Sequence, residues 1–430
     1  MSKYQIFDGK NKKALREYLV KAGQFLLPLV ESIERSEKAL DEVIDDAGRA
    51  TIEAILELSA QSVAGEKHPG KKGSEIRWHG WQDGLVSLSE REVRVSRPRL
   101  RRKGKGSGGE EAIPAYEAMR SSKRLSQRMW EILMLGLSTR RYKEVLPKMA
   151  ETVGVSKSEV SRHFIEASEE VLKGLMERRL DAWDICIVYL DGIVFGDYHA
   201  VAAIGVDTEG CKHVLGLREG ASENKVVAKA LLEDLVERGL DSERIRLFVI
   251  DGSKALRRAI DAVFGSRNPV QRCRKHKERN VVGYLPEELK EQVLSSLRTA
   301  WKLSAEKGKA RLEKMARWLD QEYPSAASSI REGLDEMFTI NELDLPASLR
   351  LCLGSTNIIE SGFSGTRNRT RRVTNWRDGK MVLRWAASAL VSTEKNFRRI
   401  QGYQSLPALE AKLAELADKK EGAAPKEKVA

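Results

Sequence analysis

The chain contains 430 residues, of which 41% are hydrophobic and 32% charged, a composition typical of a globular protein with two or three domains. It has no apolar run as long as a membrane span, and residues 1–16 mix charges throughout, so we expect neither a membrane anchor nor a signal peptide. A net charge of +12 favours nucleic acid as partner, ahead of an anionic membrane, and four widely spaced cysteines indicate a reduced, cytoplasmic protein.

The amino-terminal part of the chain changes from a helical to a strand-like pattern. Residues 1–63 carry apolar positions three and four apart, which predicts helices. Residues 64–114 show period-two alternation and then a basic, glycine-rich stretch, which predicts a short β-hairpin and a flexible basic linker. A solvated surface is the ordinary explanation for each single charge here. As a group they are expected to hold nucleic-acid phosphates, chiefly through Arg97, Arg99, Arg101 and Arg102.

Residues 115–180 return to helical spacing and contain the pattern of a helix-turn-helix. A helical stretch reaches Thr152, Gly154 supplies a tight turn, and Ser156 is placed to cap a second helix. An ordinary helical hairpin is an equally good interpretation, because the motif has few obligatory residues. In the first interpretation the second helix enters the major groove of DNA and presents Lys157, Ser158, Ser161 and Arg162.

The central part of the chain has the element order of an α/β protein. Residues 181–282 read as a three-stranded antiparallel meander followed by helix, strand, helix and strand, which predicts a mixed sheet. Residues 283–354 are helical with nothing strand-like, and residues 355–416 form a second part of the core. Residues 417–430 are polar and are predicted to be a disordered tail.

Two aspartates interrupt or follow the buried strands. Asp191 lies in "IVYLDGIVFG", where Asp-Gly is also a common turn between two strands, and a turn is the more frequent explanation of that dipeptide. Asp251 follows "RLFVI", at the carboxyl end of a strand where α/β sheets bind ligands. If the two strands pair, their carboxylates meet and must share a proton or bind a cation. Oxygen ligands suit Mg²⁺ or Mn²⁺.

A third carboxylate, Glu360, lies in "GSTNIIESGFSGTRNRTRR", one turn into a helix that Thr356 or Asn357 is placed to cap. A capping-box glutamate is the ordinary explanation for an acid at this place. The basic stretch that follows favours a metal ligand held against phosphates instead. It contains Arg367, Arg369, Arg371 and Arg372, with few acidic residues nearby.

Ordered stretches over residues 180–395 resemble the prokaryotic Mutator-type transposases of insertion sequences. They are "YLDG", "AIGVDTEGCKHVLGL", "LLEDLVERGL", "FVIDGSKAL", "VQRCRKHKERNV", "STNIIES" and the arginine-rich run after it. The resemblance implies an RNase H-like mixed sheet, an all-helical insertion before the glutamate, and preceding helical and helix-turn-helix DNA-binding regions. It also implies that Asp191, Asp251 and Glu360 are a catalytic DDE triad that binds metal.

The same resemblance implies the partners and the chemistry. Two Mg²⁺ or Mn²⁺ ions per site would activate a water and then a 3′-hydroxyl for strand cleavage and strand transfer. Asp191 would bridge the ions, and Cys273, His276 and Arg279 would support the active site. The expected partners are double-stranded DNA, both the terminal inverted repeats and the target, and a second copy in a homodimer, with no membrane.

Three alternatives stay open at this point. His276-x-x-Arg279 fits the His-x-x-Arg of tyrosine recombinases, which use a tyrosine nucleophile and no metal. A non-catalytic DNA-binding regulator on the same scaffold is the second alternative. The third is a structural zinc site, in which Cys211 and His213 join Cys273 and His276 as ligands, although zinc sites usually use tighter spacings.

Overall fold

The computed structural model describes most of the chain in two compact units. The described residues are 47–67, 75–88, 91–104, 109–120, 123–135, 157–220 and 225–421. The first unit comprises 1–128 with 140–160, and the second comprises 129–139 with 161–430. Three predictions fall outside the described residues. They concern the helices before residue 47, the absence of a signal peptide at the start of the chain, and the first helix and turn of the helix-turn-helix. Within the described ranges, no helix is both long and apolar enough to cross a membrane.

The first unit contains an antiparallel sheet packed on a helix at 47–64. Its elements are β1 (Ile76–Leu88), β2 (Arg91–Arg102), β3 (Glu110–Glu111) and α2 (Pro114–Arg120). Leu56 and Ala60 of the helix pack in one core with Val86, Val95 and other apolar residues of the strands. This core explains why the strands form, because each presents one apolar face.

The predicted hairpin is formed by β1 and β2, but the prediction of a flexible linker is wrong for the basic residues that continue β2 to Arg102. Val93, Val95 and Leu100 are buried in the core of the first unit. Arg94, between the two valines, is exposed, whereas the Arg97 guanidinium lies 4.2 Å from the ring centroid of Tyr116, a residue of this core. The basic residues therefore belong to a strand of the hairpin.

The second unit is built on a five-stranded mixed sheet with the order β6-β5-β4-β7-β8. The strands are β4 (Ile185–Phe195), β5 (Tyr198–Asp207), β6 (Lys212–Gly220), β7 (Leu247–Ile250) and β8 (Val270–Arg272). β4, β5 and β6 form an antiparallel meander, whereas β7 pairs parallel with both β4 and β8. The predicted mixed α/β sheet is confirmed.

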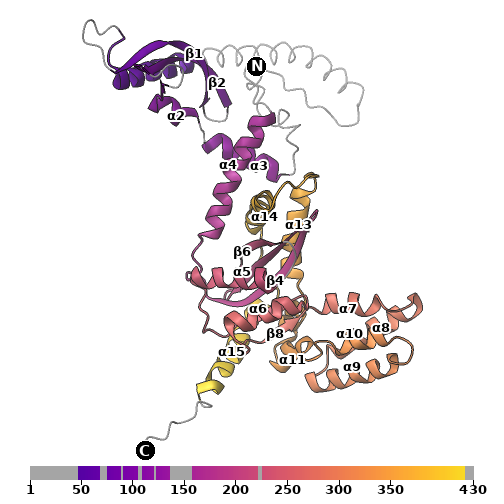
Figure 1. The fold of residues 1–430 in the computed structure, drawn as a ribbon. Helices are drawn as coiled ribbons and strands as arrows, with labels where there is room; N and C mark the ends of the chain where they lie inside the picture. The colour runs from indigo at the N-terminus through magenta and orange to yellow at the C-terminus, as the bar shows by residue number, and fades with distance from the viewer. Residues whose placement is uncertain are drawn as a thin grey trace, which may run out of the picture. The chain divides into compact units, whose positions relative to one another are not determined.

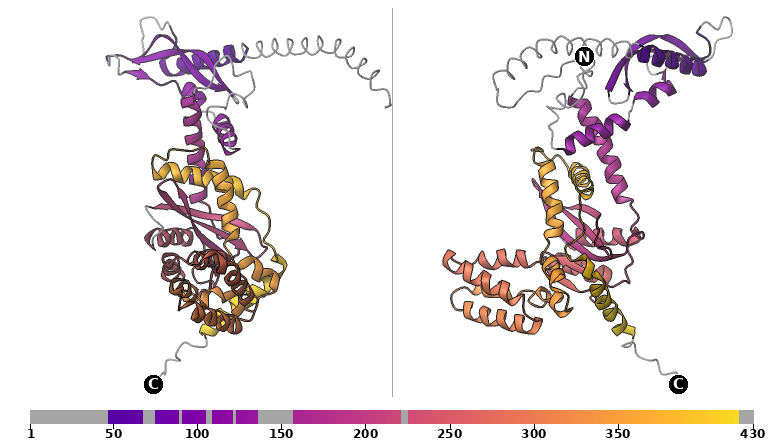
Figure 2. Two further views of the ribbon diagram at one scale, coloured as in Figure 1. Left: turned by 90° about the vertical axis from the view of Figure 1, so that its right-hand side faces the viewer. Right: turned by 180° about the vertical axis from the view of Figure 1, so that it is seen from behind.

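Helices cover both faces of this sheet, as Figures 1 and 2 show. Val188 and Leu190 of β4 pack with α5 (Lys225–Glu237) and α6 (Lys254–Phe264). Ile187 and Tyr189, which alternate with them, pack with α13 (Asn357–Thr370) and α14 (Gly379–Glu394). The face that a residue of β4 occupies therefore decides which helices it meets.

A helical array follows β8. Its elements are α7 (Arg274–Val282), α8 (Glu287–Ala300), α9 (Ala305–Leu319), α10 (Pro324–Arg331), η4 (Asp335–Met337), α11 (Thr339–Glu342) and α12 (Ala347–Leu353). The first part of this array has its own core between Val281 and Phe338. Ile340, Leu349 and Leu353 return to the core beneath the sheet. The array lies to one side of the sheet (Figure 2).

Three further helices and a short 3-10 turn complete the described chain. They are α3 (Lys123–Met134), α4 (Lys157–Met176), η5 (Tyr403–Ser405) and α15 (Leu406–Glu421). In the second unit, Phe164 and Ala167 of α4 pack against Trp130 and Leu133 of α3. α15 continues through Glu421, so the prediction of a disordered tail is wrong for 417–421. The helix is anchored by apolar residues that pack in the main core, Leu409, Leu413, Leu416 and Ala417.

Arg238 ties three elements of the second unit together, and we expect its loss to destabilise the fold. Its guanidinium donates to the carbonyls of Leu175, Arg178 and Leu215 and to Asp234 Oδ2, and the residue is only 7% exposed. Arg238→Met should lower the free energy of unfolding by about 3 kcal/mol, because it leaves buried acceptors unpaired. Urea denaturation measures this change.

Lys229→Met is the matched control, because Lys229 also pairs with an acid four residues away on the same stretch of helix. That pair, with Glu233, is solvent-exposed on both sides. Its loss should change the free energy of unfolding by less than about 0.5 kcal/mol. Similar losses in the two variants would contradict the role given to Arg238.

Candidate active site

Asp191 lies within a continuous strand, so the interpretation of Asp191-Gly192 as a turn is wrong. Asp191 pairs with Ala202 and Gly192 with Val201 in the β4–β5 ladder. The chain turns later, between Phe195 and Tyr198, where Gly196 has a φ of +59°. Asp191 is only 7% exposed, and its Oδ1 accepts a hydrogen bond from Gly192 N at 2.9 Å. Such a carboxylate is costly to bury unless partners or a cation stabilise it.

The pairing of β4 with β7 brings Asp251 next to Asp191. Leu190 pairs with Ile250 in the parallel ladder, so each aspartate is the residue directly after a paired position. Neighbouring strands lie about 4.8 Å apart. By alternation, both aspartates belong to the face that Tyr189 and Val249 occupy, which is the face covered by α13. The predicted pairing of the two strands is therefore confirmed, and it places the two aspartates at neighbouring positions of the sheet.

Asp251 is held at the point where the chain leaves the sheet. Its Oδ1 accepts a hydrogen bond from Ser253 N at 2.8 Å, and Ser253 caps α6. Gly252 between them has a φ of +112°, a conformation that side-chain-bearing residues rarely adopt. The tight turn thus fixes the Asp251 carboxylate at the carboxyl end of β7.

Glu360 lies in the first turn of α13, but it does not form a capping box. Its Oε1 accepts a hydrogen bond from the Thr356 hydroxyl at 2.8 Å. The backbone N–H of Thr356, which a capping-box glutamate would accept, donates instead to Cys273 Sγ at 3.3 Å. The Glu360 side chain is 27% exposed and so is open to a ligand.

Cys273 joins the amino-terminal ends of two helices. Its Sγ accepts a hydrogen bond from His276 N at 3.5 Å, by which Cys273 caps α7, and another from Thr356 N at 3.3 Å, at the start of α13, and the Thr356 hydroxyl oxygen lies 3.2 Å from the sulfur. Burial acts to raise the pKa of this thiol, but hydrogen bonds from His276 and Thr356 outweigh it and the pKa is lowered. Cys273 is thus a structural acceptor beneath the site.

His276 lies beside Glu360 and is influenced by the charges of both aspartates. Its Nδ1 is 3.8 Å from Glu360 Oε1 and 3.4 Å from the Thr356 hydroxyl. The hydrogen bond with the Cys273 side chain raises the pKa of His276 against the opposing effect of burial, and the negative charges of Asp191 and Asp251 raise it further. Both aspartates are therefore close enough to act on the ring that contacts Glu360.

Among the described residues, one group of possible metal ligands lies together, namely Cys273, His276 and Glu360. Asp191 and Asp251 do not belong to this group. Cys211 and His213, the other two residues of the predicted zinc site, do not belong to it either, and His213 bonds to Asp207 at 2.8 Å and stacks on Trp183.

The other predicted site residues lie outside this cluster. Arg279, one turn after His276 on α7, is exposed and lines a separate hollow with Lys254 and residues of α10. Ser161 and Arg162 are exposed on α4, and Lys157 and Ser158 begin that helix, with side chains outside the described part. After Glu360, Arg369 is half-buried and the exposed arginines are Arg367, Arg371 and Arg372.

The arginines of β2 are largely occupied within the first unit. Arg97 and Arg99 lie 3.9 and 3.3 Å from Glu110, and Arg102 lies 3.3 Å from Glu111. Arg101 contacts His79 at 3.2 Å. These contacts leave less free charge on β2 than the sequence alone indicated.

The contacts of Thr356 go beyond the helix cap that its position in the sequence predicts. In the structure its hydroxyl donates a hydrogen bond to Glu360, and its backbone N–H donates one to Cys273. The sequence places this threonine four positions before Glu360, which is the spacing of neighbours on one helix face, and this spacing could have predicted their contact.

Comparison with known proteins gives one consistent family. The model for "Transposase, Mutator family" matches residues 23–400. The chain is 26% identical over 383 residues to the transposase for insertion sequence element ISRM5 of Rhizobium meliloti, covering 86% of this chain and 91% of that protein. It is 28% identical to the IS406 transposase of Burkholderia multivorans, over 61% and 69% of the two chains. It is 26% identical to the IS1081 transposase of Mycobacterium tuberculosis, over 67% and 70%.

Thr356→Val should destabilise the protein through the site itself. The change keeps the shape of the side chain but removes the hydroxyl donor to Glu360, and a hydrogen bond to a charged group contributes about 1.5–3 kcal/mol. We expect the free energy of unfolding to fall by about 1.5 kcal/mol in urea denaturation. Thr366→Val is the control.

Thr366 is also fully buried on α13, but its hydroxyl donates to the carbonyl of Gly362 in its own helix. Its loss should lower the free energy of unfolding by less than about 1 kcal/mol, because helical carbonyls already have a backbone partner. Equal losses in the two valine variants would argue against a special contact between Thr356 and Glu360.

Proposed function

The chain belongs to the Mutator family of transposases, and from this membership and the placement of its carboxylates we propose that it is a DDE transposase. It would bind the terminal inverted repeats of an insertion sequence and catalyse metal-dependent DNA strand cleavage and strand transfer. The observation that carries the proposal is the register of β4 and β7, which sets Asp191 beside Asp251 on the face covered by the helix of Glu360. We further propose that the mixed sheet is an RNase H-like core.

Asp191, Asp251 and Glu360 would hold two Mg²⁺ or Mn²⁺ ions, and the all-oxygen donor set fits such ions. When bound, the ions supply stabilisation for the attacking and leaving oxygens of a phosphodiester. The protein contributes rigidity to this arrangement. The sheet fixes Asp191, the bond from Ser253 N orients Asp251, and the Thr356 hydroxyl orients Glu360. These contacts would restrict the motion of each carboxylate before a cation binds.

DNA recognition would use surfaces outside the carboxylate cluster. Ser161 and Arg162 on α4 are exposed, as expected of residues on a recognition helix. Arg367, Arg371 and Arg372 extend a basic surface from the helix that carries Glu360, where they would hold DNA phosphates. We expect a homodimer, because cutting an element requires two ends to be held together.

A tyrosine recombinase is the second candidate, and the position of Arg279 weighs against it. A His-x-x-Arg pair in that class must act on the same phosphate. Here His276 contacts Glu360, whereas Arg279 lines a hollow with residues of α10. A non-catalytic regulator would not need the three acids held in position, whereas here each carboxylate accepts a hydrogen bond that orients it.

Asp191→Asn, Asp251→Asn and Glu360→Gln should each abolish cleavage of transposon-end DNA while DNA binding persists. Each change removes a negative ligand, and the metal supplies several kcal/mol of transition-state stabilisation, so we expect a loss of more than about a thousandfold. Nick mapping on labelled end DNA measures cleavage, and mobility shift measures binding. Asp197→Asn, in the exposed turn after β4, is the control and should cleave normally. Normal cleavage by any of the three site variants would refute the triad.

Removal of divalent ions should stop cleavage reversibly. In EDTA the wild-type protein should leave end DNA uncut, and added Mg²⁺ or Mn²⁺ should restore cutting without forming a covalent protein–DNA product. The products are resolved on denaturing gels with and without protease. A protein-linked strand that accumulates in EDTA would favour the recombinase over the transposase.

A further inference from the structure

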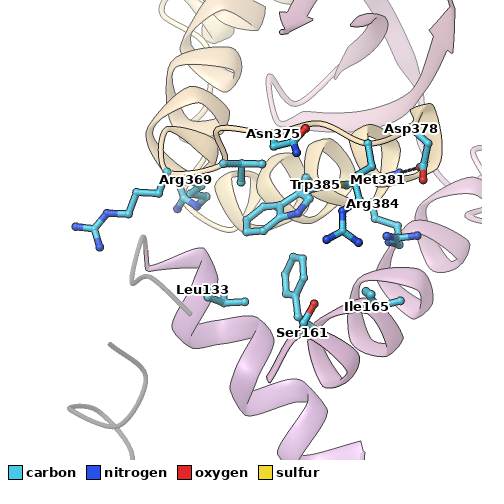
Figure 3. Close-up of a pocket in the computed structure, with 13 residues that line it drawn as sticks. Leu133, Ser161, Ile165, Arg369, Asn375, Asp378, Met381, Arg384 and Trp385 are labelled. Atoms are coloured by element: carbon cyan, nitrogen blue, oxygen red, sulfur yellow. Dashed lines mark hydrogen bonds between the residues drawn. The ribbon is translucent and has the colours of Figure 1, made fainter. Parts of the chain in front are cut away.

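A second cavity lies in the same unit, at the opposite end of α13 from Glu360. Its volume is about 480 Å³, and it is lined by the end of α13, the segment before α14, the first half of α14, and residues of α3 and α4. Figure 3 shows Trp385 and Arg384 of α14 on one side and Leu133, Ser161 and Ile165 on the other. A cavity of this size accommodates a ligand as large as one nucleotide, and it is too small for a duplex.

The cavity is rich in arginine. Its lining includes Arg369, Arg372, Arg377 and Arg384. Arg384 pairs with Glu169 at 3.3 Å, but its buried Nε has no hydrogen-bond partner. No ion pair joins the other three arginines to any residue that the structure describes. Arg369 donates to Gly365 O and Ser392 Oγ, and burial lowers its pKa. Four arginines and one acid line the cavity, so its described lining carries a net positive charge.

One acid lines the cavity beside the four arginines, and no ion pair joins it to an arginine among the described residues. Asp378 Oδ1 accepts a hydrogen bond from Met381 N at 2.7 Å and so caps α14. An anionic ligand would supply the missing negative charge, and guanidinium groups match the geometry of phosphate oxygens.

An aromatic surface lies among the arginines. The rings of Trp385 and Phe164 are in contact, with centroids 4.3 Å apart and planes tilted by 42°. The Trp385 side chain is only partly buried and contributes to the cavity wall. Phosphate-binding guanidinium groups beside a partly exposed indole form the combination that binds single-stranded nucleic acid.

We propose that this cavity holds one unpaired nucleotide of the DNA substrate, with its base stacked on Trp385 and its phosphate held by Arg369 and Arg372. The inference rests on the proposed function and adds a feature of its substrate, namely a base removed from the duplex. Unstacking a base has a cost, which stacking on an aromatic side chain offsets.

The position of the cavity on α13 predicts where that nucleotide lies. Glu360 and Arg369 belong to the same helix, nine residues apart. At 1.5 Å per residue this is about 14 Å along the axis. The distance corresponds to roughly four steps of 3.4 Å along a strand. The unpaired nucleotide would thus lie a few nucleotides from the cleaved phosphate.

The test compares two labelled single strands of about 12 nucleotides, a length within the usual site size of such proteins. One probe is oligo(dT), and the other is an abasic strand with the same number of phosphates. Full-length wild-type protein in EDTA should bind oligo(dT) about tenfold more tightly, because the abasic strand cannot stack. Trp385→Leu should bind the two probes equally. Arg372→Gln should weaken both probes alike and leave their ratio unchanged.

Two further variants separate recognition from folding. Trp385→Phe keeps an aromatic ring and should retain most of the preference for oligo(dT). Trp318→Leu removes an exposed tryptophan of α9, outside the cavity, and should behave as wild type. The proposal is overturned if the wild type shows no preference, or if Trp385→Leu keeps the preference at an unchanged Tm. Weaker binding by Arg372→Gln without any wild-type preference would identify a phosphate site alone, which also overturns it.

Cleavage of end DNA, assayed on the same preparations, separates this inference from the proposed function. Asp191→Asn should lose cleavage and keep the tenfold preference. A wild-type protein that cleaves end DNA but shows no preference for oligo(dT) would overturn the proposed nucleotide site and leave the proposed function standing. One that shows the preference, lost in Trp385→Leu, but never cleaves would sink the proposed function and support the cavity.

Discussion

The parallel pairing of β4 with β7 is the constraint on which the site depends. A shift of this register by one residue would move Asp251 away from its place beside Asp191 and would turn the alternating apolar residues of β7 toward the wrong helices. Helices cover both faces of the sheet, so such a shift would remove apolar side chains on each face from their packing partners. The burial of the core therefore enforces the geometry of the carboxylates.

The third carboxylate depends on a different interaction. The helical array separates Glu360 from the sheet strands. The Cys273 sulfur joins the two ends of this segment by accepting a hydrogen bond from the backbone N–H of Thr356, 83 residues later. Thr356 in turn holds the Glu360 carboxylate. Glu360 is thus linked to the end of β8 through the Thr356 hydroxyl and the Cys273 sulfur. The chemistry proposed for the site needs this rigidity, because a mobile ligand would have to be ordered each time a cation binds.

The sequence was sufficient to predict the mixed sheet, because its strands carry uninterrupted apolar runs and its helices have apolar positions with helical spacing. The two aspartates could be identified from where they fall relative to those runs. Whether Asp191-Gly192 was a turn could not be decided locally, since only the pairing with Ala202 shows that the strand continues. The alternation of Val93 and Val95 indicated a strand, but the arginine-rich continuation of β2 was mistaken for a linker because its buried residues, Pro98 and Leu100, do not continue that alternation. The contacts among Cys273, Thr356 and His276 join distant segments, and no local pattern reports them.

The closure at Cys273 has a consequence for how this architecture can change. The first part of the helical array has a core of its own, and both of its ends are fastened where the array meets the sheet, through Cys273 with Thr356 at one point and Gln271 with Met337 at another. The entropic cost of closing a loop grows only slowly with its length. A change in the length of the array should therefore alter the free energy of folding only slightly, provided that the contacts at both of its ends are kept.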